Sequence, residues 1–250
     1  MTDNVIVTRD GAVQIVRMNR PEKKNALTRA MYEAMAKALR DGDADPAIRC
    51  HLFLGQPGAF SAGNDMADFI ALASGNLSGD DVFDFLYALA NSQKPIVSAA
   101  DGIAVGIGAT MHFHCDLTFV TPRTEFRTPF IDLGITPEAG STLLAPVLMG
   151  RQQAFAMLAL GEGFSAERAL AAGLIYRIVG EDELEAAALA AAENIAAKPP
   201  EALKIARDLI LGPREALLAR IREEGDHFMG RLKSDEARNA FMAFMSRKKA

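Results

Sequence analysis

Short strand-like runs alternate with helix-like stretches in the first half of the chain. Of all the features of the sequence, this alternation constrains the fold class most strongly. Runs rich in Val, Ile, Leu and Phe occupy residues 4–10, 12–19, 49–55, 94–101, 117–121 and 124–128. Asp10-Gly11, between the first two runs, is typical of a hairpin turn. Apolar residues at helical spacing occupy 27–41 and 80–91, and Thr28 is the predicted N-cap of the first helix. Strands that alternate with helices predict an α/β fold.

Helical periodicity dominates from residue 139 onward, apart from a predicted strand at 173–179. The adjacent prolines Pro199 and Pro200 are expected to end one helix and to begin another. We therefore predict two parts, a core domain at residues 1–197 and a C-terminal helical region at residues 198–250.

Composition and charge exclude several classes of protein. The 250 residues carry a net charge of −5, so the chain lacks the basic character of a nucleic-acid-binding protein. The two cysteines, Cys50 and Cys115, form no CxxC pattern and indicate a reducing compartment. We see neither a signal peptide nor an apolar run of the roughly 20 residues that a membrane-spanning helix needs. We expect a cytoplasmic protein without a membrane or nucleic-acid partner.

Two segments of small residues each lie between a strand-like run and a helix-like run. They are FSAGNDMADF at 60–69 and DGIAVGIGATMHF at 101–113. Alone, each segment is better explained by a simple strand-to-helix turn or by close packing, and Met111 replaces the third glycine of a dinucleotide fingerprint. Together, they could supply a pair of backbone N–H donors, which suits an enolate, a tetrahedral oxyanion or a thioester carbonyl.

Glu138 stands in an apolar setting, within TPFIDLGITPEAGSTLLA at 128–145. One interpretation is a first-turn glutamate that complements a helix dipole. The other is a catalytic acid. Burial would raise its pKa and a helix N-terminus would lower it, and the sequence leaves the sign open. His112 and His114 are two residues apart, so on a helix they would not share a metal ion, and we predict no metal site.

Six segments, in their order and spacing, carry a resemblance to a known family. They are MNRPEKKNALT, FSAGNDMADF, DGIAVGIGATMHFHCDLTFV, LGITPEAGSTLLAPVLMG, GEGFSAERALAAGLIYRIV and SDEARNAFMAFMSRKK. The chain resembles the enoyl-CoA hydratase/isomerase (crotonase) superfamily over nearly its whole length. The resemblance implies a spiral of ββα units that forms two nearly perpendicular sheets, followed by C-terminal helices that build homotrimers, often paired into hexamers. It implies an acyl-CoA thioester substrate and no cofactor.

The resemblance also implies site residues. The oxyanion donors are the backbone N–H groups of Asn64 and Ile107, and the Ile107 side chain would add bulk beside the acyl chain. Asp65 is expected to order the first donor segment. The residues expected to contact the substrate or its CoA part are Lys24, Ala26, Ala62, Gly63, Asp65, Gly106 and Phe130.

The acids depart from the hydratase pattern. The two positions that carry glutamates in hydratases of this family hold Thr110 and Phe130 here, and neither can transfer a proton in the way hydration requires. Glu138 matches the position of the glutamate in Δ3,Δ2-enoyl-CoA isomerases of the peroxisomal type. A single carboxylate suffices for a 1,3-proton shift. Asp132 is a possible second acid or a loop cap.

The prediction is therefore an isomerase that converts 3-enoyl-CoA to trans-2-enoyl-CoA, with Glu138 as the proton shuttle. Another reaction of the superfamily is the nearest alternative: hydration, thioester hydrolysis or decarboxylation. The alternative from another class is a catalytically silent acyl-CoA-binding subunit.

Overall fold

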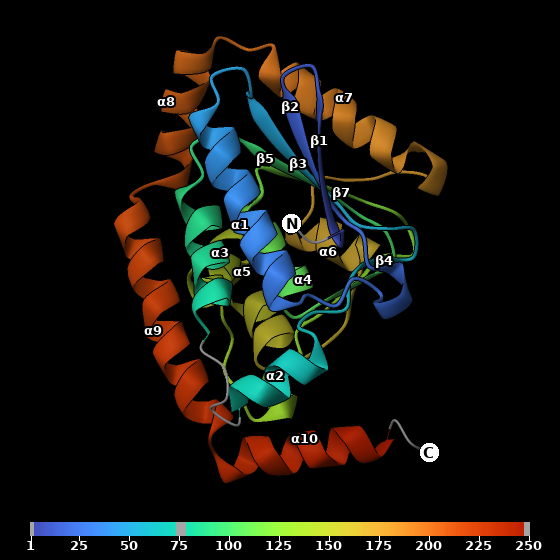
Figure 1. The fold of residues 1–250 in the computed structure, drawn as a ribbon, viewed down its shortest axis with the longest axis vertical. Helices are drawn as coiled ribbons and strands as arrows, with labels where there is room; N and C mark the ends of the chain where they lie inside the picture. The colour runs from blue at the N-terminus through green and yellow to red at the C-terminus, as the bar shows by residue number, and fades with distance from the viewer. Residues whose placement is uncertain (1–2, 74–78, 248–250) are drawn as a thin grey trace.

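Two β-sheets form the centre of the fold in a computed structural model that describes residues 3–73 and 79–247 (Figure 1). The larger sheet has six strands, in the order β1 (Val5–Asp10), β2 (Val13–Met18), β3 (Cys50–Leu54), β5 (Ile96–Ala100), β7 (Leu117–Val120) and β10 (Arg177–Ile178). The β1–β2 pair is an antiparallel hairpin that turns at the predicted Asp10-Gly11, and the remaining pairs are parallel.

The smaller sheet has four strands, in the order β4 (Ala59–Ser61), β6 (Ile103–Val105), β8 (Glu125–Arg127) and β9 (Phe164–Ser165). Strands β4, β6 and β8 are parallel, and each directly follows a strand of the larger sheet along the chain. The chain therefore winds as a spiral of ββα units. This confirms the predicted α/β fold class and its C-terminal helical region.

Ten α-helices surround the sheets in the described residues (Figure 1). They are α1 (Arg29–Ala44), α2 (Met66–Ala73), α3 (Asp80–Asn91), α4 (Ile107–Thr110), α5 (Ser141–Leu158), α6 (Ala166–Ala172), α7 (Leu184–Ala196), α8 (Pro200–Leu211), α9 (Arg214–Leu232) and α10 (Asp235–Arg247). Thr28 caps α1 as predicted, because its side chain accepts the Met31 N–H. None of these helices combines the length and the apolar composition needed to cross a membrane.

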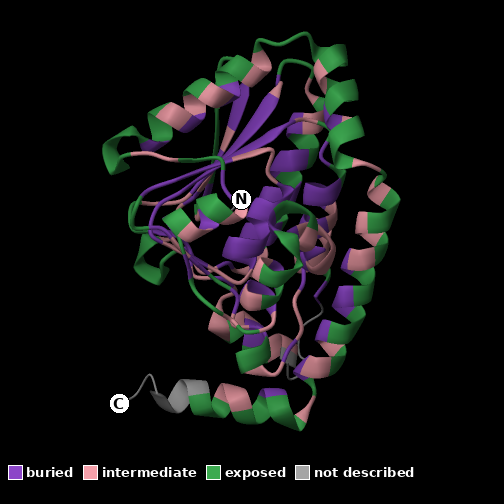
Figure 2. Ribbon diagram, turned by 180° about the vertical axis from the view of Figure 1, so that it is seen from behind, coloured by how far each residue is buried: buried purple, intermediate pink, exposed green. Residues whose placement is uncertain are grey.

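The core is layered about the larger sheet. Every residue of β3 and β5 is buried, as expected for strands covered on both faces. Helix α7 covers one face through Leu184, Ala188 and Ala192. The other face meets the main core, and the buried residues run through the centre of the molecule in Figure 2. Helix α9 adds residues such as Phe228 to this main core, so the C-terminal helices contribute to the same interior.

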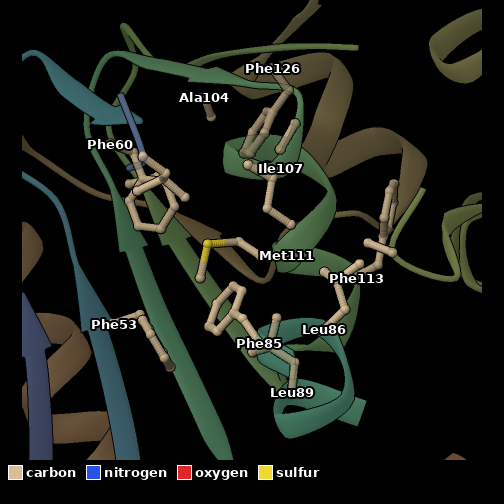
Figure 3. Close-up of a cluster of buried hydrophobic side chains, with 14 of the residues drawn as sticks. Phe53, Phe60, Phe85, Leu86, Leu89, Ala104, Ile107, Met111, Phe113 and Phe126 are labelled. Carbon is tan, nitrogen blue, oxygen red and sulfur yellow. The ribbon is translucent and has the colours of Figure 1, made fainter. Parts of the chain in front are cut away.

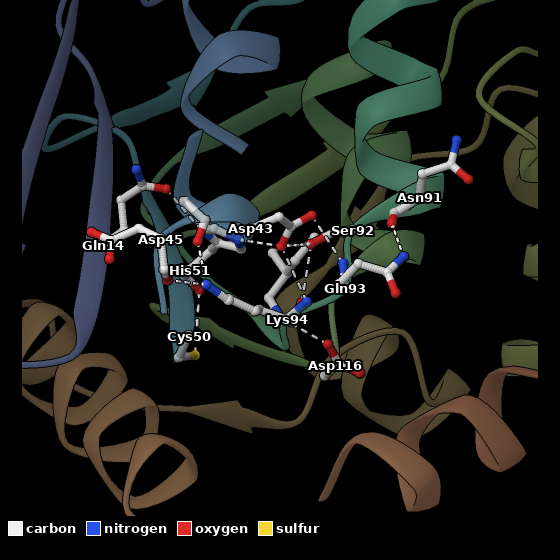
Figure 4. Close-up of polar contacts among 12 residues, drawn as sticks. Gln14, Asp43, Asp45, Cys50, His51, Asn91, Ser92, Gln93, Lys94 and Asp116 are labelled. Atoms are coloured by element: carbon white, nitrogen blue, oxygen red, sulfur yellow. Dashed lines mark hydrogen bonds and ion pairs between the residues drawn. The ribbon is translucent and has the colours of Figure 1, made fainter. Parts of the chain in front are cut away.

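A buried polar cluster ties the end of α1 to the larger sheet (Figure 4). The imidazole of His51 lies 2.8 Å from Gln14 Oε1 and 3.1 Å from Asp43 Oδ1. Asp43 also accepts the backbone N–H groups of Gln93 and Lys94, which lead into β5. These contacts tie the C-terminal end of α1 to β2, to β3 and to the residues that precede β5.

The structure corrects three local predictions. The strand expected at 173–179 is reduced to Arg177–Ile178, because Gly173 ends α6 in the left-handed region and only two residues pair with β7. The stretch predicted as helical after residue 139 contains β9, which pairs with β8. The helix near Glu138 begins at Ser141, after a turn. The division at residues 197 and 198 stays a prediction, and the last two residues of the C-terminal motif lie outside the described residues.

Candidate active site

The two segments of small residues lie against each other at one edge of the smaller sheet. Strands β4 and β6 are parallel neighbours, so both segments begin at the same end of the sheet. A Cβ atom added to Gly63 would lie 2.9 Å from Val105 O, and one added to Gly108 would lie 2.8 Å from the Ser61 side chain. Glycine is therefore required at both positions for close approach of the two backbones.

The backbone N–H of Asn64 points away from the neighbouring chain segment. Leu27 N–H donates to Gly63 O at 2.7 Å, and Asp65 N–H donates to Leu27 O at 2.9 Å. In such a parallel bridge the residue between the two bonded groups directs its own N–H to the opposite side. Within residues 3–73 and 79–247, no protein group accepts a hydrogen bond from the Asn64 N–H.

The Ile107 N–H is also free of a protein acceptor in the described part of the chain. Ile107 is the first residue of α4, where backbone N–H groups have no partner within the helix. Gly106 before it adopts φ 57° and ψ −122°, which turns the chain from β6 into the helix. Because an added Cβ at Gly106 would meet no atom within 4 Å, a ligand has open space beside this turn.

The Ile107 side chain is not where the resemblance suggested. It is 1% exposed and lies in the main core with Met111 and Phe126 (Figure 3). The expectation that it adds bulk beside an acyl chain is therefore wrong. The β-to-α turn directs the backbone N–H outward and the side chain inward.

Glu138 is buried, with 8% of its surface exposed, in the turn that precedes α5. Thr110 at the end of α4 donates its hydroxyl to Glu138 Oε1 at 2.7 Å. Burial raises the pKa of Glu138 to about 8, the Thr110 hydrogen bond opposes this rise, and the charge of Glu224 adds to it. The structure thus settles the sign that the sequence left open.

Two cavities meet at Asn64. Both Asn64 and Glu138 line the first cavity. Its remaining wall is largely apolar, with Leu72, Phe83 and Phe228 among its residues. Asp68 also lines it, and its carboxylate accepts the Arg29 N–H at 3.0 Å. Glu138 and Asn64, whose N–H has no acceptor among the described residues, therefore line one largely apolar cavity.

The second cavity is larger, with about 1660 Å³ of empty volume including its open side. It shares Asn64, Phe69 and Phe228 with the first cavity. Six residues predicted for the site line it, and they are Ala62, Gly63, Asn64, Gly106, Phe130 and Asp132. Asp132 is exposed and does not line the cavity that contains Glu138.

Three other predicted residues lie beside the first donor segment. Lys24 adopts φ 50°, and its carbonyl accepts the Ala62 N–H at 2.9 Å. The Ala26 carbonyl accepts a hydrogen bond from Arg20, which also forms an ion pair with Asp65 at 2.7 Å. Asp65 Oδ1 accepts the Ala67 N–H at the start of α2. Asp65 therefore orders this segment, as the sequence analysis expected.

Sequence reasoning missed two polar residues. Tyr32 on α1 donates its hydroxyl to the Asn64 side chain, and Glu224 on α9 contacts the turn after Glu138. Tyr32 lies on the apolar face of its predicted helix, so its hydroxyl was a detectable signal. Glu224 stands among other charged residues in RIREEGD, which gave no signal.

The histidines and cysteines form no metal site in residues 3–73 and 79–247, where no group of three or more His, Cys, Asp or Glu side chains could hold an ion. His112 packs between Phe60 and Phe126, and His114 Nε2 lies 2.7 Å from Ala139 O. Burial lowers the pKa of His112 to about 3 and that of His114 to about 4, so both are neutral at physiological pH.

Comparison with known proteins identifies the family to which this fold belongs. The family profile described as "Enoyl-CoA hydratase/isomerase" matches residues 8–250. A crystal structure of an enoyl-CoA hydratase/isomerase from Pseudoalteromonas atlantica T6c superposes with a TM-score of 0.93 at 37% identity, covering 98% of each chain. The ββα spiral with its two paired donor segments is the crotonase fold. The chain belongs to the enoyl-CoA hydratase/isomerase family and is an enzyme of that family.

Individual relatives carry different names. Enoyl-CoA delta isomerase 2 of Rattus norvegicus is 32% identical over 250 residues, covering 98% of this chain and 64% of the rat protein. This chain therefore spans just under two thirds of that relative's length. A protein of Rhizobium meliloti named "Probable enoyl-CoA hydratase" is 30% identical, covering 99% of this chain and 97% of the relative. The particular reaction of this chain has to be argued from its own residues.

Proposed function

We propose that this enzyme isomerises 3-enoyl-CoA thioesters to trans-2-enoyl-CoA. The observation that carries the proposal is the shared apolar cavity of Glu138 and Asn64. A carboxylate and a backbone oxyanion donor in one water-poor site are the groups that proton abstraction next to a thioester requires. The similarity to the rat delta isomerase supports the same reaction.

In the proposed reaction, the N–H groups of Asn64 and Ile107 bind the thioester oxygen. Glu138 removes a proton from C2, and the electron pair of that C–H bond delocalises into a dienolate whose negative charge rests on the thioester oxygen. The protonated Glu138 then delivers the proton to C4, and the double bond moves from C3–C4 to C2–C3. Only a proton is transferred, so the step needs no redox cofactor.

The raised pKa of Glu138 suits this role. A carboxylate with a pKa of about 8 is a much stronger base than an ordinary glutamate, and the C2 proton of a thioester is only weakly acidic. Burial, the first cause of the shift, also keeps the protonated acid from exchanging freely with solvent before it returns the proton.

Thr110 supports isomerisation over hydration. Hydration must both activate a water molecule and protonate the α-carbon, which calls for two acid–base groups. Thr110 contributes a neutral hydroxyl that already donates to Glu138. Phe130, at the other hydratase position, is 5% exposed and lines the neighbouring cavity with an apolar ring.

Wild-type protein with two CoA esters and three readouts tests the proposal. With 3-hexenoyl-CoA, we expect the ultraviolet absorbance of the conjugated thioester to appear. Loss of that absorbance from 2-hexenoyl-CoA would instead indicate hydration, and release of free thiol would indicate hydrolysis. Binding of the CoA esters with no change in any of them would indicate a silent acyl-CoA-binding subunit. Any of these three results without isomerisation contradicts the proposal.

We also propose that the chain assembles into homotrimers through its C-terminal helices. Ile205, Leu209 and Ile210 on α8 expose 59%, 79% and 83% of their surfaces, a run of apolar side chains that a second copy would cover. Light scattering on purified protein is expected to give three times the mass of the chain, or six times that mass if two trimers pair, and a monomeric mass would contradict this assembly.

A further inference from the structure

Glu224 is a buried carboxylate on α9 that the proposed reaction does not use. It is 5% exposed and lies 86 residues after Glu138 in the sequence. Glu224 Oε2 accepts the Gly140 N–H at 2.6 Å, and Oε1 accepts the Thr142 N–H at 2.9 Å and the Thr142 hydroxyl at 2.5 Å. Three donors from one short segment therefore converge on a single carboxylate.

That segment is the turn that presents Glu138. Ala139 and Gly140 both adopt the left-handed region, with φ 64° and φ 68°. A left-handed non-glycine residue costs on the order of 1–3 kcal/mol and persists only where the surroundings hold it. His114 Nε2 lies 2.7 Å from Ala139 O on one side of the turn, and Glu224 binds the N–H groups on the other. The turn is held from two separate elements of the fold.

We propose that Glu224 is a positioning residue for the reaction. Its carboxylate holds the Ala139–Gly140 turn in the conformation that places Glu138 in the cavity with Asn64. A second part of this role follows from the charge of Glu224, which opposes ionisation of Glu138. The proposal rests on the proposed function, because it treats Glu138 as the catalytic base.

The charges around the two carboxyl groups support the second part of this role. Glu224 faces Arg220, Glu223 and His227 of its own helix, which line a small cavity with it. Arg220 donates to Thr142 Oγ1 at 3.0 Å and pairs with Glu223 at 3.0 Å. Burial raises the pKa of Glu224, while its hydrogen bonds from Thr142 and Gly140 and the charge of Arg220 lower it.

Glu138 is surrounded by different groups on the other side of the turn. Tyr32 and Arg29 of α1 and Asp68 of α2 line its cavity, and neutral His114 lies behind the turn. Glu224 is the ionisable group whose charge raises the pKa of Glu138, as an addition to burial. Removing that charge should therefore lower the pKa of Glu138.

The test separates geometry from charge with two variants. Glu224→Gln removes the charge and one of the two acceptor oxygens, whereas Glu224→Asp keeps the charge and shortens the reach. The titration of Glu138 is followed by infrared spectroscopy of its protonated carboxyl band, which is assigned by its loss in Glu138→Gln. The rate of 3-hexenoyl-CoA isomerisation is measured in parallel. Glu223→Gln is the matched control, because it removes a charge one residue away on the exposed side of α9.

We expect Glu224→Gln to lower the titration midpoint of Glu138 by roughly one pH unit and kcat by about tenfold or more, with KM little changed. Glu224→Asp should lower kcat and leave the midpoint within a few tenths of a unit. If Glu224→Gln fails to fold, Thr142→Val, which removes one of the three hydrogen bonds, should still lower kcat.

Two results overturn the proposal. In the first, the Glu224 variants have the same titration midpoint of Glu138 and the same kcat as the control variant Glu223→Gln. The other is a fall in kcat with an unmoved midpoint in Glu224→Gln, which would assign Glu224 a structural role alone. The infrared titration needs no turnover, so it still tests Glu224 if the wild-type enzyme does not isomerise 3-hexenoyl-CoA and the proposed function fails.

Discussion

Thr110 Oγ1 donates a hydrogen bond of 2.7 Å to Glu138 Oε1, and this pair joins the helix after the second donor segment to the turn before α5. The hydroxyl stands where the hydratase resemblance would place a second acid. It stabilises the ionised form of Glu138 against the burial that otherwise disfavours it. Glu138 is therefore the one carboxylate of this pair, and its partner is a neutral hydrogen-bond donor.

Thr110→Val should raise the pKa of Glu138 above about 8, because the hydrogen bond that favours the carboxylate is removed while burial persists. Valine has a similar shape, so the packing around α4 should be retained. The acidic limb of the kcat/KM profile should move to higher pH by about half a unit or more. A limb that stays in place in this variant would show that the hydroxyl does not influence the base.

The wild-type enzyme should show kcat/KM that rises about tenfold per pH unit below pH 8 and levels above it, since the base acts only when ionised. An ordinary glutamate would give a profile already level near pH 6. The measurement is kcat/KM for 3-hexenoyl-CoA from about pH 6 to pH 9.5. A flat profile across this range would contradict the assigned pKa.

Glu138→Gln should become more stable relative to the wild type as pH rises. The pKa of Glu138 is about 8 in the folded protein against an ordinary 4.5, so between these values the folded state binds more protons than the unfolded chain. Wild-type stability therefore falls as pH rises through this window. Glutamine does not titrate. The difference in unfolding free energy between the variant and the wild type should therefore shift in favour of the variant by roughly 2–4 kcal/mol between pH 4 and pH 8.

Denaturant unfolding of both proteins across this pH range measures the difference. A stability difference independent of pH would mean that Glu138 ionises in the folded protein as readily as in the unfolded chain.

Gly106→Ala should lower kcat/KM by about 10²–10³-fold, the usual effect of losing one oxyanion donor. Gly106 adopts φ 57°, and the added methyl would meet no atom within 4 Å, so the effect would come from a changed backbone and a misdirected Ile107 N–H. Gly212→Ala is the matched control, because Gly212 has φ 73° and equally open surroundings but joins α8 to α9. Equal loss of activity in both variants would indicate general destabilisation instead.

Features set by local sequence were predicted well. Thr28 caps its helix and Asp10-Gly11 turns its hairpin because both depend on a few neighbouring residues. The two donor segments were recognisable because small residues between a strand and a helix allow few other conformations. The order of these elements, together with the family resemblance, was sufficient to predict the spiral.

Features set by long-range packing were not predictable. The direction of the pKa shift of Glu138 depends on burial by α1, α2 and α9, which are distant in sequence. The contact between Glu224 and Gly140 joins residues 84 positions apart. The Ile107 side chain points inward because of the backbone turn at Gly106. The identity of residue 107 alone does not show how that turn orients its side chain.

The rate of 3-hexenoyl-CoA isomerisation by Glu138→Gln tests the central claim most directly. The variant keeps the size of the side chain and an acceptor for Thr110 but cannot take up a proton as a carboxylate does. We predict a kcat at least about 10³-fold below that of the wild type, with unchanged binding of hexanoyl-CoA measured by calorimetry. Isomerisation at the wild-type rate would contradict the claim that Glu138 carries the proton from C2 to C4.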